Sequence, residues 1–550
     1  MKINEIYNNV SDITIESYLS KLGIIDVPNY IKPSGEYLDL PLIYNNMEEG
    51  VELLKYHYLK QSDIYVLCDS DVDGITSISI LYAYLKLLNK NWNIKILLHD
   101  GKERGLADKK VFKEILSNPR PLLIIPDAGS NEVEQTRKVF ENRTDVLVLD
   151  HHAIKTPIDC GVLINNQSQD CNKNLSGCGV THKFLQALDL EFDVHYSELF
   201  IDIVALSIIA DGCDIRSSEN RLYLKAGLFN GTISNEFLRE LIGQYVYKSS
   251  EFTIRDLSFS VIPKINSVIR SDNVEMKQRV LKAFIGIDDA KEVSELCGNY
   301  HKEQMGIVKQ FITDNEDKVN KEDNVIVLCS DDLKRSYSGL ISGRLSNIYN
   351  RPCIVGRPHG NEVIGSFRGK GITRQYMENC TGINWAMGHD KDAFGISLDL
   401  SKIDDLREEL NTLSIDYEPY TDVLISSTIT SLPIGLYGLF SGLNELWSEQ
   451  FLPKPKYHIH SIKINTNDIK LLGKKGNTLK FISDGVEFIK FSSNEELRNK
   501  LHIGEGKNIL ISIFGELELN VYRGKETKQI IINEILEVEE IGEVNFNDIF

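Results

Sequence analysis

The sequence lacks the features that mark several classes of protein. Its 550 residues include only 14 Pro and 9 Cys, and no two cysteines form a C-x-x-C pair. An odd number of scattered cysteines argues against a disulfide framework and against a structural zinc site, so we expect reduced thiols in a cytoplasmic protein. No stretch approaches 18 uninterrupted apolar residues, and no apolar run precedes a cleavage-like site near the N-terminus. We therefore expect neither a membrane span nor an export signal.

The sequence is also poor in positive charge. Lys and Arg number 61 against 80 Asp and Glu, which gives a net charge of −19. A field of this sign repels nucleic acid at long range unless basic residues gather locally or metal ions supply positive charge. Net charge therefore does not indicate a nucleic-acid role. The 42% of hydrophobic residues can fill several cores, and the length predicts about two to four domains.

Short apolar runs alternate with amphipathic, helix-like stretches such as residues 76–90 over the first part of the chain. This alternation indicates a parallel α/β sheet, in which ligands bind beyond the carboxyl ends of the strands. The predicted strands are IYVLC (64–68), IKILL (94–98), LLIIP (122–126), VLVL (146–149) and GVLI (161–164).

The rest of the chain predicts further parts of different character. Helical patterns, including a buried helix at 199–210, are followed by a long polar helix over about 288–321 and by a second α/β pattern at 325–405. From about residue 456, period-two alternation with glycine-containing turns favours a small β-barrel. We predict an N-terminal segment with the parallel-sheet domain (1–287), a connecting helix (288–323), a second α/β domain (324–410), a linker (411–454) and the barrel (455–550).

Acidic residues follow the predicted strands. They stand in the strings Asp69-Ser70-Asp71-Val72-Asp73-Gly74, Pro126-Asp127-Ala128-Gly129 and Asp150-His151-His152, and Asp211 follows the buried helix. Such clustering is repulsive unless a cation neutralises it. Hard oxygens with two imidazoles and no sulfur suit Mn²⁺ or Mg²⁺ better than Zn²⁺ or Ca²⁺. Two such ions sharing a carboxylate would activate water and hold a phosphoryl group for in-line attack.

Each string also has a simpler structural explanation. A D-x-D-x-D-G string alone is more often a calcium-type or solvated turn, and an isolated Asp-His-His is weaker evidence still. What favours a catalytic site is their coincidence, because each string follows its own strand at the edge where this type of sheet binds ligands.

Taken in order, these strings resemble the four motifs of the DHH phosphoesterases: C-D-S-D-V-D-G (68–74), P-D-A-G-S-N (126–131), L-D-H-H (149–152) and A-D-G (210–212). The resemblance continues over about residues 38–535 into the RecJ branch of single-strand-specific exonucleases. It includes LSGCGVTHKFLQAL (175–188), SSENRL (217–222) and IPKINSVIRSDN (262–273), and then GSFRGKG (365–371) and GHDKDAFGISL (388–398) of the DHH-associated domain. The terminal part resembles the RecJ oligonucleotide-binding barrel.

The resemblance implies roles for individual residues. The ligands of two metal ions would be Asp71, Asp73, Asp127, His151 and Asp211, with Asp127 bridging. Asp69 would support the first motif, and His152 would stabilise the charge that develops on the scissile phosphate. The implied substrate-binding residues are Asn266, Arg270, Gly365, Ser366, Arg368 and His389, among which Ser366 and Arg368 would clamp the terminal phosphate because a guanidinium binds phosphate bidentately. Arg270 could instead form a surface salt bridge.

In the barrel, basic residues and aromatic side chains would hold the strand by charge and stacking, although each aromatic residue could instead belong to the core. The basic residues are Lys456, Lys474, Lys475, Arg523 and Lys525, and the aromatic ones are Tyr457, Phe481 and Tyr522.

Some positions depart from the family pattern. Where bacterial members usually have W-H-P-G, this chain has Leu333-Lys334-Arg335-Ser336. The arginine that precedes the family's E-G-Y-G-L loop aligns with His99, which leaves Lys102 or Arg104 to serve the phosphate. None of these departures removes an implied metal ligand.

The resemblance thus implies a metal-dependent 5′→3′ exonuclease that hydrolyses single-stranded DNA to 5′-mononucleotides. We expect a monomer with single-stranded DNA as its partner, and a single-stranded-DNA-binding protein or a helicase as candidate protein partners. One alternative is a DHH phosphodiesterase acting on short RNA or cyclic dinucleotides, although such relatives are generally shorter and lack the barrel. The other is an inactive RecJ-like replication scaffold, which would have no reason to keep so repulsive an acidic cluster.

Overall fold

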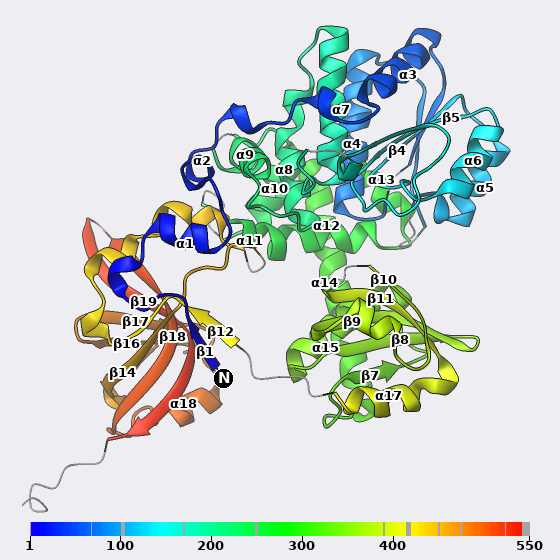
Figure 1. The fold of residues 1–550 in the computed structure, drawn as a ribbon. Coiled ribbons are helices and arrows are strands. Elements are labelled where there is room, and N and C mark those ends of the chain that lie inside the picture. Colours follow the sequence, from blue (N-terminus) through cyan, green and yellow to red (C-terminus); the bar gives the residue numbers. More distant parts are fainter. Residues whose placement is uncertain are drawn as a thin grey trace, which may run out of the picture. The chain divides into compact units, whose positions relative to one another are not determined.

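The computed structural model describes residues 2–67, 69–100, 105–168, 171–230, 232–247, 251–388, 391–413, 420–448, 451–473, 476–522 and 524–541 (Figure 1). The chain divides into two compact units. Unit 1 combines Met1–Ser34, Thr253–Arg255 and Glu418–Phe550, and unit 2 combines Gly35–Phe252 and Asp256–Tyr417.

Unit 2 contains the predicted parallel sheet. Its strand order is β3-β2-β4-β5-β6, and all four strand pairs are parallel. The strands are β2 (Ile64–Leu67), β3 (Ile94–Leu97), β4 (Leu122–Pro126), β5 (Asp145–Asp150) and β6 (Val162–Asn165). All residues of β2 and β4 are buried, as expected for strands covered on both faces.

Helices cover both faces of this sheet. On one face, α5 (Lys109–Ser117) and α6 (Val133–Glu141) share a core with alternate strand residues. On the other, α3 (Met47–Lys60) brings Gly50 against Leu147, Ile164 and the Phe184 ring of α7 (Gly177–Phe192). The helix α4 (Val72–Leu88) packs against α7 (Figure 1).

The first helix of the sheet begins earlier than the sequence pattern predicts. We predicted a helix over 76–90, whereas α4 starts at Val72 because the Asp71 carboxylate accepts a hydrogen bond from Gly74 N at 3.1 Å and caps it. The acidic string is therefore half loop and half helix, and Asp73 lies in the first helical turn.

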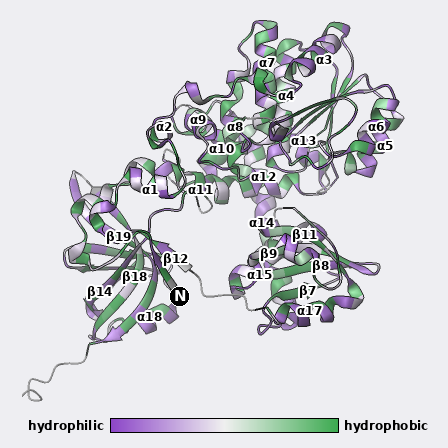
Figure 2. Ribbon diagram, viewed as in Figure 1, coloured by the Kyte–Doolittle hydropathy of each residue, from purple (hydrophilic) through white to green (hydrophobic). Residues whose placement is uncertain are grey.

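A helical region follows the sheet. It comprises α8 (Ile201–Ala210), α9 (Ser218–Leu224), α10 (Glu236–Tyr245), α12 (Ile262–Ile269) and α13 (Val274–Phe284), whereas most of the short α11 (Ile254–Asp256) is assigned to unit 1. The apolar α8 is buried along most of its length (Figure 2). The long helix predicted over 288–321 is α14 (Ala290–Asp314), which ends earlier and is followed by a short 3-10 turn.

The second α/β part of unit 2 is a mixed sheet with strand order β10-β11-β9-β8-β7. Its strands are β7 (Ile326–Cys329), β8 (Cys353–His359), β9 (Glu362–Thr373), β10 (Ile383–Gly388) and β11 (Lys391–Asp399). One face packs against α15 (Ser338–Tyr349), and the other against α16 (Arg374–Glu378) and α17 (Ile403–Asn411). The strand β9 is central and is paired on both of its edges.

Unit 1 is built around a seven-stranded mixed sheet with the order β13-β14-β18-β19-β17-β16-β15. Its strands are β13 (Ser426–Ser427), β14 (Tyr457–Asn465), β15 (Lys470–Leu472), β16 (Thr478–Ser483), β17 (Val486–Lys490), β18 (Asn508–Tyr522) and β19 (Lys525–Glu540). The N-terminal β1 (Lys2–Glu5) pairs in parallel with β12 (Tyr420–Val423), and α1 (Ile15–Lys21), α2 (Val27–Ile31) and α18 (Glu495–Lys500) complete the unit.

The aromatic residues suggested for strand binding in this unit have another role where they are described. Tyr457 and Phe481 are buried, so they belong to the core and cannot stack on bases. Lys474, Lys475 and Arg523 lie outside the described residues. None of the described helices is both long and apolar enough to span a bilayer.

Candidate metal centre

The predicted acidic strings meet at the carboxyl edge of the parallel sheet. After β2 the chain crosses to β3 on one side, and β4 then pairs on the other side of β2. The ends of β2 and β4 therefore lie at a topological switch point, where open α/β sheets bind ligands. Asp69 follows β2, Asp127 follows β4, and Asp150 ends β5.

Asp73 is held at the start of another helix. Its carboxylate accepts hydrogen bonds from Gly177 N at 2.7 Å, Cys178 N at 2.8 Å and the Ser207 hydroxyl. The first two donors are at the N-terminus of α7, where amides have no partner within the helix and favour negative charge. Asp73 is buried and fixed in orientation.

Asp127 is a deeply buried acid of the centre whose pKa is perturbed. It is 1% exposed and has a left-handed backbone with φ of 61°. Burial raises its pKa well above the ordinary value, and the charges of Asp73, Asp71, Asp69 and Asp211 raise it further. Its Oδ1 atom has no hydrogen-bond partner among the described residues. A bound cation would therefore stabilise the ionised form of this buried carboxyl group.

Gly177 leaves the space that this carboxylate occupies. A β-carbon at position 177 would lie 2.4 Å from Asp127 Oδ1, a distance that no real contact allows. The glycine at the start of α7 is therefore required by the close approach of Asp127.

His151 faces the acids from the end of β5. Its Nε2 lies 3.3 Å from Asp127 Oδ1 and 3.6 Å from Asp73 Oδ2, and its Nδ1 lies 3.8 Å from Asp211 Oδ2. The buried Nε2 atom has no hydrogen-bond partner among the described residues. Burial raises the pKa of Asp211 to about 6, against the opposing charge of His151.

Asp150 organises the two histidines, a role that the sequence interpretation missed. It accepts hydrogen bonds from Ser130 N at 3.1 Å, His151 N at 2.7 Å, His152 N at 3.2 Å and His152 Nδ1 at 2.8 Å. Burial alone would raise its pKa, but the hydrogen bond and charge of His152 lower it below the ordinary value. The ionised Asp150 thus fixes the His152 ring and assigns the proton to Nδ1.

These residues fit divalent metal ions. Ligand atoms from Asp73, His151 and Asp211 lie within 4.8 Å of one another, and so do those from Asp127, Asp150, His151 and His152. The centre combines buried acceptor atoms that lack partners among the described residues with several carboxylates and imidazoles. Mn²⁺ or Mg²⁺ would bind such oxygen-rich ligands and neutralise their charge. Asp71 is in neither group. Its carboxylate caps α4 and lies 3.8 Å from Arg270 Nη2.

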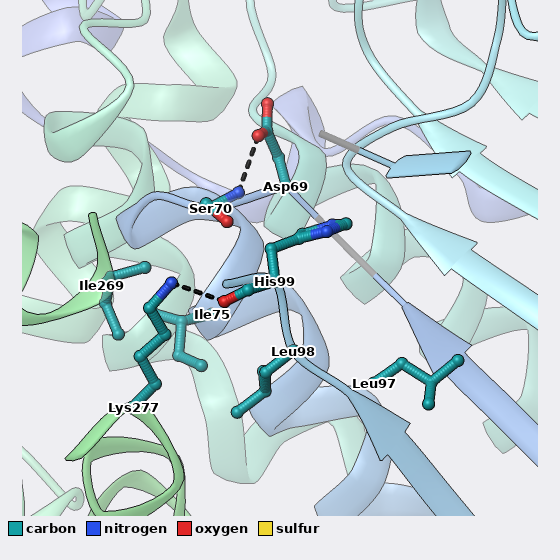
Figure 3. Close-up of a pocket in the computed structure, with 8 residues that line it drawn as sticks. All are labelled: Asp69, Ser70, Ile75, Leu97, Leu98, His99, Ile269 and Lys277. Carbon is teal, nitrogen blue, oxygen red and sulfur yellow. Dashed lines mark hydrogen bonds between the residues drawn. The ribbon is translucent and has the colours of Figure 1, made fainter. Parts of the chain in front are cut away.

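Asp69 lies beside the segment that follows β3. It accepts a hydrogen bond from Ser70 N at 2.6 Å and lines a small pocket with His99 and Lys277 (Figure 3). His99 Nδ1 is 3.0 Å from Asp108 Oδ2, and buried Lys277 Nζ donates to the His99 carbonyl at 2.7 Å. His99 therefore has a structural partner. Lys102 and Arg104 lie outside the described residues.

The predicted substrate residues that are described lie in two places, at α12 and in β9. Asn266 and Arg270 are on or at the end of α12, and both Asn266 Oδ1 and Arg270 Nε are buried without hydrogen-bond partners among the described residues. Ser366 Oγ is 2.9 Å from Ser338 Oγ. Burial, and then the charge of Arg270, lowers the pKa of Arg368. His389 lies outside the described residues.

Gly365 has a packing role in β9. A β-carbon there would lie 2.2 Å from the Val355 carbonyl oxygen of β8. Because β9 is paired on both edges at this point, the groups in this sheet that can reach a phosphate are the side chains of Ser366 and Arg368 rather than the Gly365 backbone.

Comparisons with known proteins agree with this architecture. The DHH family, N-terminal domain, matches residues 63–208. YorK, a protein of Bacillus subtilis derived from prophage SPbeta and named as a candidate single-strand DNA-specific exonuclease, is 29% identical over 539 residues, which cover 89% of this chain and 90% of YorK. The single-stranded-DNA-specific exonuclease RecJ of Bacillus subtilis is 23% identical over 538 residues, covering 90% of this chain and 64% of that protein.

Among solved structures, RecJ in complex with Mn²⁺ from Thermus thermophilus superposes with a TM-score of 0.76 at 19% identity. The match covers 98% of this chain and 79% of that one. The predicted α/β fold class with a parallel DHH-type sheet is confirmed.

Proposed function

We propose that this chain, which belongs to the DHH family and is RecJ-like, is an exonuclease that hydrolyses single-stranded DNA with divalent metal ions. It would act from the 5′ end and release 5′-mononucleotides. The observation that carries the proposal is the pair of buried atoms Asp127 Oδ1 and His151 Nε2, which are 3.3 Å apart and have no hydrogen-bond partners among the described residues. Acids that a metal would neutralise surround this pair.

Asp73, Asp127, His151 and Asp211 would hold two Mn²⁺ or Mg²⁺ ions, with Asp127 shared and Asp71 completing the set from the α4 cap. When bound, the ions would supply an activated water and compensate charge on the phosphoryl oxygens. The hydrogen bonds from α7 to Asp73 keep that carboxylate in place before the ions arrive.

The remaining side chains would act on the substrate. His152, oriented by Asp150, would donate to the scissile phosphate as its charge develops. Ser366 and Arg368 would bind the terminal 5′ phosphate. Arg270, which is 3.8 Å from Asp71 and lowers the pKa of Arg368, would act between this clamp and the metal centre. A terminal phosphate held at a fixed distance leaves only the first phosphodiester within reach of the activated water.

The test is digestion of end-labelled strands with Mn²⁺, with Mg²⁺ and with EDTA. A 5′ label should appear at once as mononucleotide, a 3′ label should shorten progressively, and EDTA should abolish both reactions. Asp127→Asn keeps the shape of the side chain but removes its charge, and it should eliminate activity. Asp404→Asn is the matched control, since the Asp404 side chain is 90% exposed.

Other results would contradict the proposed substrate, direction or metal centre. Cleavage of short RNA or cyclic dinucleotides without cleavage of DNA strands would indicate the phosphodiesterase alternative. Immediate release of the 3′ label would contradict the direction, and an active Asp127→Asn variant would exclude the metal centre described above.

A further inference from the structure

A second basic cavity lies in the DHH-associated part of unit 2, outside the residues assigned above. It has a volume of about 250 Å³ and is lined by Arg335, Arg357, Pro358, His359 and Ile364. Arg335 begins a 3-10 turn before α15, and the other residues come from β8 and β9. The volume is several times the roughly 30 Å³ that one water occupies in the liquid, so a polyatomic anion can enter.

The two guanidinium groups of this cavity are not compensated. Arg335 and Arg357 are exposed, as is the His359 ring, and none of the three forms an ion pair with a described residue. The guanidinium of Arg357 makes one long hydrogen bond to the described part of the chain, from Nη1 to the Leu333 carbonyl at 3.5 Å. In contrast, neighbouring Lys334 is 3.5 Å from the Asp272 carboxylate. In a chain of net charge −19, unpaired guanidinium groups at one cavity indicate an anion, and their planar geometry suits phosphate.

The register of the sheet places this cavity beside the predicted phosphate clamp. On β8 and β9, Arg357 lies opposite Ile364 and Val355 lies opposite Ser366. Alternate residues of a strand share one face, so Ile364, Ser366 and Arg368 form a row with about 7 Å between neighbours. The cavity is therefore one step along the same face from Ser366.

The clamp and the cavity both lie near the end of α12. Arg270, which contacts Asp71, lowers the pKa of Arg368, and Lys334, beside Arg335, is 3.5 Å from Asp272. Ile364 is at the end of the row opposite Arg368. A strand whose 5′ phosphate is on Ser366 and Arg368, and whose first phosphodiester is at the metals, would have no nucleotide left to reach the cavity.

We propose that Arg335, Arg357 and His359 bind a second phosphate group, one step along the same sheet face from the terminal-phosphate clamp. The phosphate would be a further one on the same 5′ end, as in a 5′-triphosphate, or a free phosphate. This inference rests on the proposed function, which assigns the terminal 5′ phosphate to Ser366 and Arg368. Arg335 stands in the string that replaces W-H-P-G, so the family resemblance does not imply this site.

The first experiment measures binding without catalysis. Inorganic phosphate is titrated calorimetrically into the metal-free Arg368→Ala protein, which removes the main cation of the neighbouring clamp. Adding Arg335→Ala and Arg357→Ala should weaken the remaining binding about tenfold or more, as expected when hydrogen bonds to charged groups are lost. Lys113→Ala, an exposed residue of α5 with no ion pair among the described residues, is the control and should change nothing.

The second experiment distinguishes the two sources of phosphate. Strands of one sequence with a 5′-monophosphate or a 5′-triphosphate are digested by the wild type and by the Arg335→Ala/Arg357→Ala variant. If the phosphate is attached to the strand, the wild type should show a KM about tenfold lower for the triphosphate, and the variant should not discriminate. If it is free, neither protein should discriminate, and the titration should still depend on Arg335 and Arg357.

A titration unaffected by both substitutions, or a triphosphate preference that persists in the double variant, would overturn the proposal. Failure of the proposed function has a different signature. No strand would be cleaved by the wild type, although phosphate binding would still depend on Arg335 and Arg357.

Discussion

Asp211 makes the metal-free protein less stable than it could be, and the size of this effect can be worked out. Its pKa of about 6 in the folded chain compares with an ordinary value of 3.8. A carboxyl that binds its proton more tightly when folded lowers the free energy of unfolding as the pH rises from about 3.8 to 6, and the loss is complete at neutral pH. At 1.36 kcal/mol per pKa unit the difference corresponds to about 3 kcal/mol.

Removing this charge should therefore stabilise unit 2 when metal is absent. The Asp211 side chain is 28% exposed, so solvent screens part of the repulsion, and we expect Asp211→Asn to raise the free energy of unfolding by about 1–2 kcal/mol near pH 7.5 in EDTA. At about pH 4.5 the gain should shrink to about a third, because the wild-type carboxyl is then mostly protonated in the folded state. Saturating Mn²⁺ should reverse the order, because the variant replaces a carboxylate that we propose as a ligand by a neutral amide.

The assay is urea unfolding followed by tryptophan fluorescence in a Trp447→Phe background. Trp447 belongs to unit 1, so the remaining signal comes from Trp92 and Trp385 of unit 2. Asp404→Asn serves as the control and should change the free energy by less than about 0.5 kcal/mol. A variant less stable than the wild type in EDTA near neutral pH, or a gain of equal size at about pH 4.5, would refute the reasoning.

Three further predictions concern the centre and the clamp. Gly177→Ala should abolish metal binding and activity in a folded protein, because the added β-carbon would press on the buried Asp127 carboxylate. Gly243→Ala, where nothing lies within 4 Å of the added atom, is the control and should change neither metal content nor digestion. His152→Ala should lower kcat more than metal content and His151→Ala should lower both, so equal metal loss by elemental analysis would contradict the division. Arg368→Ala should cost on the order of 1.5–3 kcal/mol in kcat/KM for a 5′-phosphorylated strand and much less for a 5′-hydroxyl strand, and indifference to the phosphate would remove the clamp.

The parallel sheet was largely predictable, because its strands are short apolar runs bounded by polar residues. All five predicted strands are present, and their ends differ from the prediction by at most one residue. Cys68, the predicted end of the first strand, lies outside the described residues. The start of α4 was missed because periodicity does not detect a cap. The Asp71 carboxylate extends the helix by four residues beyond the apolar pattern that predicted it.

The site was predictable in composition but not in its internal contacts. The acids could be found because each follows a strand, and parallel strands bring their carboxyl ends together. The role of Asp150 could not, since its donors are mostly backbone amides, which leave no mark in the sequence, and Ser130 N reaches it from a loop 20 residues away. The bonds from α7 to Asp73 join residues 104 and 105 positions apart, and nothing in either segment alone indicates them.

The composition of unit 1 has a consequence for how the protein is made. Its first 34 residues leave the ribosome long before Glu418, the first residue of their partner segment, and β1 cannot pair until β12 exists. At about 5–20 residues per second, the delay between Ser34 and the end of β19 at Glu540 is roughly 25 to 100 seconds. During this time unit 2 can fold while Tyr18 of α1 lacks Phe440 and Trp447, the aromatic rings that it contacts in unit 1. A chaperone would therefore encounter a nascent chain in which residues 1–34 are among the last to fold.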